Sequence, residues 1–171
     1  GDPRTMSGPG PSDARGGHAG AEWFAAPGQS TPGEAGLRFS CTQCGNCCSG
    51  PPGYVLISTS DAAAMSARLG LTTDEFERRY TRRLREGWSL NEVEGAHGFD
   101  CVFLDRNTHP GRAVCSIYDV RPAQCRTWPF WPSNLKSPES WARAGRVCPG
   151  INKGPLYTPV QIRVQRDAFN I

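Results

Sequence analysis

A recurring apolar position predicts one clear amphipathic helix in this chain. Phe76, Tyr80 and Leu84 recur every four residues and would lie on one face of a helix. The preceding Thr72-Thr73-Asp74-Glu75 matches a capping box, in which side chains satisfy the free backbone N–H groups of a helix start. We therefore predict a helix from this box to about Glu86.

Other segments predict short elements of both kinds. Strands are expected where β-branched and aromatic residues gather, at 54–57, 88–94, 101–104 and 113–117, with a hairpin turn at 106–111. Helices are expected over 61–69 after a Ser58 or Ser60 cap, from Pro122 through Cys125, over 138–146, and from Thr158 onward. The pattern has no internal repeat, so it predicts a small, irregular α+β domain.

The first 36 residues show neither the helical nor the strand period. They are rich in Gly, Pro, Ala and Ser, a composition that favours disorder. We predict a disordered tail over 1–36 and a single domain over 37–171. About 135 residues can bury a modest core, which cross-links would help to hold.

Charge and hydropathy narrow the class of protein. The net charge is only +3, which by itself indicates no particular partner. No apolar run reaches the length of a membrane span, and residues 1–36 lack the apolar core of a signal peptide. We expect a cytoplasmic protein with no membrane partner.

Eight cysteines carry the candidate chemistry. Free thiols oxidise and bind metals unselectively, so this number indicates disulfides, metal coordination or redox chemistry. The dense run over 41–48 is awkward for several simultaneous disulfides, and nothing predicts secretion. Metal coordination is therefore favoured, with the ligands Cys41, Cys44, Cys47, Cys48, Cys101, Cys115, Cys125 and Cys148.

The spacing of the first three cysteines indicates one shared centre. Cys41, Cys44 and Cys47 are three residues apart, so a loop curling around an ion can present all three sulfurs. Zinc knuckles use such spacing. Three cysteines in series with a remote Cys-Pro also match bacterial iron–sulfur ligation, and Cys148-Pro149 can supply the fourth ligand.

Cys48 needs a different partner set. Neighbouring side chains tend to diverge, so we expect Cys47 and Cys48 not to share an ion. A second four-sulfur set would combine Cys48 with Cys101, Cys115 and Cys125. For Cys101, which lies in an apolar segment, plain core packing is the alternative.

Two arginines flank Cys125. The guanidinium groups of Arg121 and Arg126 can offset the negative charge of bound thiolates and donate hydrogen bonds to sulfur from outside the ligand set. An ordinary surface ion pair is the alternative for Arg121. The aromatic side chain of Trp128 would shield such a site from water.

Several ordered motifs together resemble the YkgJ-type CxxCxxCC cysteine-cluster family of zinc- or iron-chelating domain proteins. The resemblance covers about residues 39–150. It implies a metal centre held by these cysteines, with zinc or iron as the cofactor. The matching motifs are the run at 41–48, Cys101-Val102-Phe103-Leu104, the segment from Cys115 to Phe130, and Cys148-Pro149-Gly150.

The leading functional hypothesis is a metal-binding protein whose domain is organised around a multi-cysteine centre. The metal is iron, including as an iron–sulfur cluster, or zinc. A metal-handling module that delivers the ion to a partner is an alternative. Nothing in the sequence matches a Ser/His/Asp catalytic set or a Gly-rich phosphate loop, so no reaction, substrate or protein partner is predicted.

A nucleic-acid-binding zinc module is the other alternative. Arg78, Arg79, Arg82 and Arg85 would lie on one face of the predicted 72–86 helix and could contact phosphates. A solvated face with i,i+4 pairs, such as Arg82 with Glu86, is the favoured interpretation. We therefore expect metal ions, and no nucleic acid, as partners.

Overall fold

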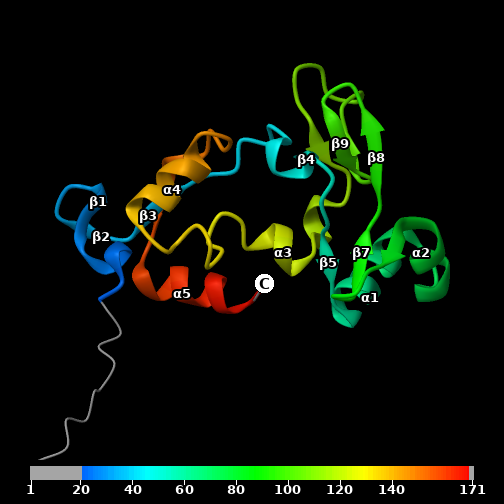
Figure 1. Ribbon diagram of the computed structural model, residues 1–171, viewed down its shortest axis with the longest axis horizontal. Helices are drawn as coiled ribbons and strands as arrows, with labels where there is room; N and C mark the ends of the chain where they lie inside the picture. The colour runs from blue at the N-terminus through cyan, green and yellow to red at the C-terminus, as the bar shows by residue number, and fades with distance from the viewer. Residues whose placement is uncertain (1–20, 170–171) are drawn as a thin grey trace, which may run out of the picture.

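The computed structural model describes residues 21–169, which form an α+β fold of short elements (Figure 1). The predicted α+β class is confirmed. Among these residues the α-helices are α1 (Thr59–Leu69), α2 (Thr73–Tyr80), α3 (Ala123–Arg126), α4 (Pro138–Gly145) and α5 (Pro159–Asp167). The 3-10 helices are η1 (Trp23–Ala25), η2 (Asn46–Cys48) and η3 (Tyr118–Val120).

The described strands form small, separate antiparallel sheets. Three sheets are pairs: β1 (Pro27–Thr31) with β2 (Glu34–Ala35), β3 (Leu37–Phe39) with β12 (Ile151–Tyr157), and β10 (Leu104–Asp105) with β11 (Val114–Cys115). Two sheets have three strands: β4 (Ser49–Gly50), β9 (Gly98–Cys101) and β8 (Glu92–Gly95), and β5 (Leu56–Ile57), β7 (Trp88–Leu90) and β6 (Thr81–Arg83).

Capping boxes start three of the helices. Ser58 begins α1, Thr72 begins α2 and Thr158 begins α5, and each side chain accepts a hydrogen bond from the backbone N–H three residues later. These local hydrogen bonds depend only on neighbouring residues. They explain why the helix starts were predictable from sequence.

The predicted helix over 72–86 is too long. It ends at Tyr80, and Thr81 begins strand β6, which pairs with β7 so that Thr81 faces Leu90 and Arg83 faces Trp88. The Thr81 hydroxyl donates to the carbonyl oxygen of Glu77 at 2.7 Å. Strand pairing provides the backbone hydrogen bonds of residues 81–83. The predicted apolar face of the helix therefore includes Phe76 and Tyr80 but not Leu84.

The arginine face predicted for a nucleic-acid module is therefore not formed. Arg82 lies on a strand, where its Nη1 donates to the Leu90 carbonyl oxygen at 3.0 Å and its Nη2 lies 3.4 Å from the Glu92 carboxylate. Its partner is Glu92 and not the predicted Glu86. Arg83 lies over the Trp88 ring, 5.4 Å from the ring centroid.

The predicted tail boundary at residue 36 is also wrong. Residues 23–35 form η1, β1 and β2, and the Phe24 side chain is only 2% exposed. The Trp23 indole N–H donates to the Leu135 carbonyl oxygen at 2.8 Å, and Glu22 pairs with Arg163 and Arg166 of α5. Long-range contacts order this Gly- and Pro-rich segment; the rest of the predicted tail, residues 1–20, lies outside the described residues.

Two separate apolar cores hold the fold. The terminal core joins both ends of the described chain: Phe24, Leu37, Phe39, Phe130, Leu135, Trp141, Ala144, Ile151 and Ile162. The central core is formed by side chains from α1, α2, β7 and the segment 103–117: Ala62, Met65, Phe76, Leu90, Phe103 and Ile117. In Figure 1 the elements of the terminal core lie on the left and those of the central core on the right, with the 41–48 loop running between them.

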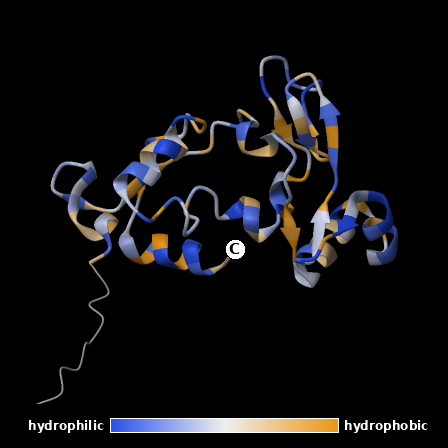
Figure 2. Cartoon of the chain, viewed as in Figure 1, coloured by the Kyte–Doolittle hydropathy of each residue, from blue (hydrophilic) through white to orange (hydrophobic). Residues whose placement is uncertain are grey.

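Hydrophobic residues are spread in short patches over both parts of the molecule. Figure 2 shows α5 with orange bands between blue ones, whereas α2 is mostly blue. Across residues 21–169, the longest and most apolar helices still fall short of what a membrane crossing requires.

Candidate metal centre

Strand pairing brings the first and last cysteines together. Cys41 lies two residues after the end of β3 and Cys148 three residues before the start of β12, and these two strands pair with Phe39 opposite Ile151. The Ser40 N–H donates to the Gly150 carbonyl oxygen at 3.1 Å. A side chain at Gly150 would overlap the Ser40 carbonyl, so glycine is required for this approach.

A tight turn and a second strand pair position the end of the run. Gly45 has a positive φ of 77°, and a Cβ there would overlap the Ala113 side chain. The η2 turn then presents Cys47 and Cys48, and β4 pairs with β9 so that Ser49 lies opposite Asp100. This register carries Cys48 beside the strand that ends at Cys101.

The remaining cysteines come from three different elements. Cys115 lies on β11 opposite Leu104, and Cys125 lies on α3. The Cys148 N–H donates to the Ala144 carbonyl oxygen at 3.0 Å, which continues the last turn of α4. Backbone hydrogen bonding therefore positions each of these three cysteines.

One cavity collects most of these thiols. It has a volume of about 50 Å³, and seven of the eight cysteines line it: Cys41, Cys44, Cys47, Cys48, Cys115, Cys125 and Cys148. Cys101 lies next to it, in the wall of a neighbouring cavity that also contacts Cys47 and Cys48. All eight cysteines are free thiols, and Cys41 and Cys47 are the exposed ones.

The expected divergence of Cys47 and Cys48 is wrong. Their Sγ atoms lie 3.7 Å apart, within the range of an S–H···S hydrogen bond. The η2 turn curls the backbone so that the adjacent side chains point the same way. The two predicted ligand sets, one with Cys47 and the other with Cys48, are therefore not separated in space at these two residues.

Hydrogen bonding and burial move the pKa values of the thiols apart. The hydrogen bond from Cys48, with help from the nearby Arg121 charge, lowers the pKa of Cys47 to about 7. The same hydrogen bond and burial raise the pKa of Cys48. Cys47 is therefore the more acidic thiol of the pair.

Burial is the main cause of the pKa shifts of Cys101, Cys115 and Cys125. It raises the pKa of Cys101 to about 11, and it also raises the pKa values of Cys115 and Cys125. Neighbouring thiols of the group contribute to each increase. A metal that binds these sulfurs must displace their protons, so binding would release acid.

The two predicted arginines occupy different places. Arg121 lies with its Cζ 3.6 Å from the centroid of the Tyr118 ring. Its charge helps to lower the pKa of Cys47 and offsets a small part of the rise that burial causes in the pKa of Cys125. Arg126 is exposed, and its Nη1 donates to the Arg121 carbonyl oxygen at 3.2 Å. Arg121 is thus close enough to the thiols to affect their pKa values, whereas Arg126 donates a hydrogen bond to the backbone of Arg121.

Trp128 lines the cysteine cavity with an unsatisfied donor. Its indole Nε1 is buried and has no hydrogen-bond partner within residues 21–169. A buried N–H without an acceptor costs about 1–3 kcal/mol. A deprotonated sulfur held by a metal would be a suitable acceptor, so this donor fits a thiolate centre.

The thiols are gathered but not yet arranged as a coordination sphere. Within the described part of the chain, no three His, Cys, Asp or Glu side chains already converge on one point at ligand distances. The structure therefore brings together the predicted donors, while a formed metal centre is not part of it. Closing a sphere requires side-chain movement in the 41–48 loop and its neighbours.

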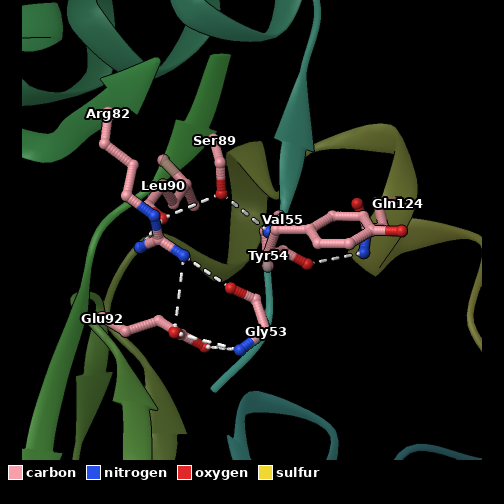
Figure 3. Close-up of polar contacts among 8 residues, drawn as sticks. All are labelled: Gly53, Tyr54, Val55, Arg82, Ser89, Leu90, Glu92 and Gln124. Atoms are coloured by element: carbon pink, nitrogen blue, oxygen red, sulfur yellow. Dashed lines mark hydrogen bonds and ion pairs between the residues drawn. The ribbon is translucent and has the colours of Figure 1, made fainter. Parts of the chain in front are cut away.

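A polar network that sequence reasoning missed holds the segment after the cysteine run (Figure 3). The buried Ser89 hydroxyl accepts from the Val55 N–H at 3.0 Å, and the Glu92 carboxylate accepts from the Gly53 N–H at 3.1 Å. The Gln124 amide, 5% exposed, bonds the backbone on both sides of Val55. The position of Gln124 directly before Cys125 was the sequence signal that could have identified it.

Comparison with known proteins supports a cysteine-based role. The family model CxxCxxCC, described as "Putative zinc- or iron-chelating domain", matches residues 40–149. The chain is 35% identical over 97 residues to the uncharacterized protein MJ0661 of Methanocaldococcus jannaschii, which covers 56% of this chain and 46% of that relative. The chain thus spans about half the length of that relative. No solved structure matches the chain.

Proposed function

The chain belongs to the CxxCxxCC family of zinc- or iron-chelating domains, and from this premise we propose that its cysteine group holds a metal that links the two apolar cores. The observation that carries the proposal is the single cavity lined by seven free cysteines. These cysteines come from segments far apart in the sequence. Thiolates are strong ligands for both zinc and iron.

The two cores meet at these cysteines. Cys148 packs against the terminal core, whereas Cys101 and Cys115 pack against the central core. A metal bound by thiolates from both sides would tie the cores together. Because such ligands are brought together only in the folded chain, the binding free energy would become folding free energy.

We assign iron ahead of zinc, with Cys41, Cys44, Cys47 and Cys148 as the ligands of an iron–sulfur cluster. Cys48, Cys101, Cys115 and Cys125 would hold a second metal beside it, and the two centres together would link the cores. Three cysteines in series with a remote Cys-Pro match the ligand pattern of bacterial clusters. The four cluster ligands line the same cavity. A cluster held there would supply one-electron transfer.

Residues around these cysteines suit a buried, negatively charged centre. The Arg121 guanidinium would offset thiolate charge, and the Trp128 indole N–H would donate to sulfur. Phe39 and Trp128 contribute apolar walls to the cavity. A low-dielectric wall strengthens the hydrogen bonds to sulfur and shifts the potential of a bound metal.

Anaerobic purification with elemental analysis and an absorption spectrum tests the assignment. A brown protein with iron and visible absorption supports the cluster, whereas a colourless protein with stoichiometric zinc refutes it. Cys148→Ser should reduce the metal content, while Thr42→Ala, which also changes a residue of the cavity wall, should not. A wild-type protein that holds neither metal when both are supplied contradicts the whole proposal.

A metal-delivery role is the second candidate because Cys41 and Cys47 are exposed. An incoming ligand can attack a metal at an exposed thiolate, so the ion could exchange without unfolding the chain. Competition with a mild chelator distinguishes the two roles. Loss of the metal within minutes, with the melting temperature of the chain unchanged, would support delivery over a structural centre.

A further inference from the structure

A second cavity adjoins the cysteine cavity. It has a volume of about 190 Å³, and Cys41, Tyr118 and Arg121 lie in the walls of both. The second cavity differs in its lining, because polar side chains from α3 and α5, Arg126 and Gln165, contribute to it. It is therefore a separate polar space that opens beside the thiols.

Two guanidinium groups give this second cavity a positive charge. Arg121 and Arg126 both line it, and its described lining includes no Asp or Glu. Neither arginine forms an ion pair with any residue of the 21–169 segment. Two cations that share a cavity without a carboxylate favour an anion in the space between them.

The hydrogen-bonding groups of both arginines are only partly used. Arg121 donates through Nε to the Tyr118 carbonyl oxygen at 3.0 Å, and its stacking on the Tyr118 ring fixes the plane of the guanidinium. Arg126 donates through Nη1 to the Arg121 carbonyl oxygen. Among residues 21–169 the other N–H groups of each fork have no acceptor, which leaves them for a ligand. Ser40 and Tyr157 add hydroxyl groups to the same walls.

We propose that this cavity binds a small organic oxyanion, a carboxylate or a phosphate, through Arg121 and Arg126. Planar guanidinium groups match pairs of oxyanion oxygens. Phe130 and Trp128 line the cavity as well and would contact the apolar part of such a ligand. The ligand would lie next to Cys41, beside the cysteine group. The thiols are not ligands of the anion, whereas Arg121 lines both cavities and would face the anion as well as the cysteine group.

Calorimetric titration of the full chain at constant ionic strength tests the proposal, with inorganic phosphate and benzoate as the two probes. At least one probe should bind saturably at one site per chain, and the probe that binds identifies the oxyanion. Arg126→Gln should weaken binding about tenfold or more, because it removes a charge-assisted contact. Arg112→Gln, which removes an exposed arginine outside the cavity, should leave binding unchanged.

A second pair of variants separates the site from any effect on the cysteines. Gln165→Glu places a carboxylate in the cavity from α5, which carries no cysteine, and should also weaken binding. Val164→Glu, at a position 63% exposed on the same helix, should not. Saturation by neither probe, equal losses in Arg112→Gln and Arg126→Gln, or full binding in Gln165→Glu would each overturn the proposal. Metal content measured in each variant shows whether the metal site fails separately.

Discussion

Gln124 holds the backbone of Leu56 beside the helix that carries Cys125. Its Oε1 accepts from the Leu56 N–H at 2.7 Å, and its Nε2 donates to the Tyr54 carbonyl oxygen at 3.0 Å. Tyr54 and Leu56 follow the cysteine run by only a few residues. The amide therefore ties the segment that follows the run to the helix that carries Cys125.

Replacing this amide should loosen the centre. Gln124→Leu removes the acceptor of the partly buried Leu56 N–H and the donor to the Tyr54 carbonyl oxygen, which should lower the free energy of unfolding by about 1–3 kcal/mol. Urea denaturation measures this change, and metal titration should show weaker binding. Gln29→Ala, at an exposed position on β1, serves as the control. Equal stability of the two variants would show that the Gln124 contacts have no structural role.

The pair of adjacent thiols should have a measurable signature in the metal-free protein. Cys47 should be alkylated with a midpoint near pH 7, because the Cys48 hydrogen bond stabilises its thiolate. Cys48→Ala removes this donor and should move the midpoint up toward the ordinary thiol value of 9.0. Mass spectrometry of the peptide containing Cys47 follows the reaction, with Cys44→Ala as the control. An unchanged midpoint in Cys48→Ala would exclude the hydrogen bond.

A bidentate ion pair predicts a pH-dependent part of the stability. Arg106 donates to both carboxylate oxygens of Asp100, at 2.6 and 2.8 Å, and these hydrogen bonds lower the pKa of Asp100 to about 2. Because the folded pKa is below the ordinary 3.8, the contribution is complete above pH 3.8 and is lost as the pH falls through 2.

Asp100→Asn should therefore lower the stability at pH 7 by about 1 kcal/mol, since a third of the Arg106 side chain is exposed and solvent screens the pair. Denaturation at pH 7 and at lower pH compares the variant with wild type, and the difference should shrink toward pH 2. Glu86→Gln, at an exposed position without an ion pair within 21–169, should show no such trend. A constant difference would mean that Asp100 acts through something other than its charge.

Removing the metal should destabilise both cores together. If thiolates from both cores share the metal, a strong chelator should lower the melting temperature of the loaded protein by about 5 °C or more. Near-ultraviolet circular dichroism follows Trp141 and the other aromatic residues of the terminal core. Melting that is insensitive to the chelator would contradict a linking role, even if metal is bound.

The N-terminal segment should contribute to stability through one aromatic residue. Phe24→Ala empties a position that is 2% exposed in the terminal core and should cost about 3–5 kcal/mol. Val164→Ala, at a position 63% exposed, is the control and should change little. A small effect of Phe24→Ala would mean that residues 23–35 are dispensable for folding.

Local signals were readable from the sequence because they depend on neighbouring residues. The capping boxes at Ser58, Thr72 and Thr158 located three helices, and the hairpin around 106–111 is confirmed by the pairing of Leu104 with Cys115. The end of α2 was not readable. Helical period and strand pairing compete after Tyr80, and the partner strand that decides between them begins at Trp88.

The sequence by itself determined the candidate donors, since eight cysteines with this spacing already predict a thiolate centre. Only the tertiary structure decided which of them are neighbours. The pairing of β3 with β12 places Cys41 near Cys148, and the η2 turn places the Cys47 and Cys48 sulfurs in contact. Such proximity arises from strand register and backbone turns between residues distant in sequence, which no local spacing rule contains.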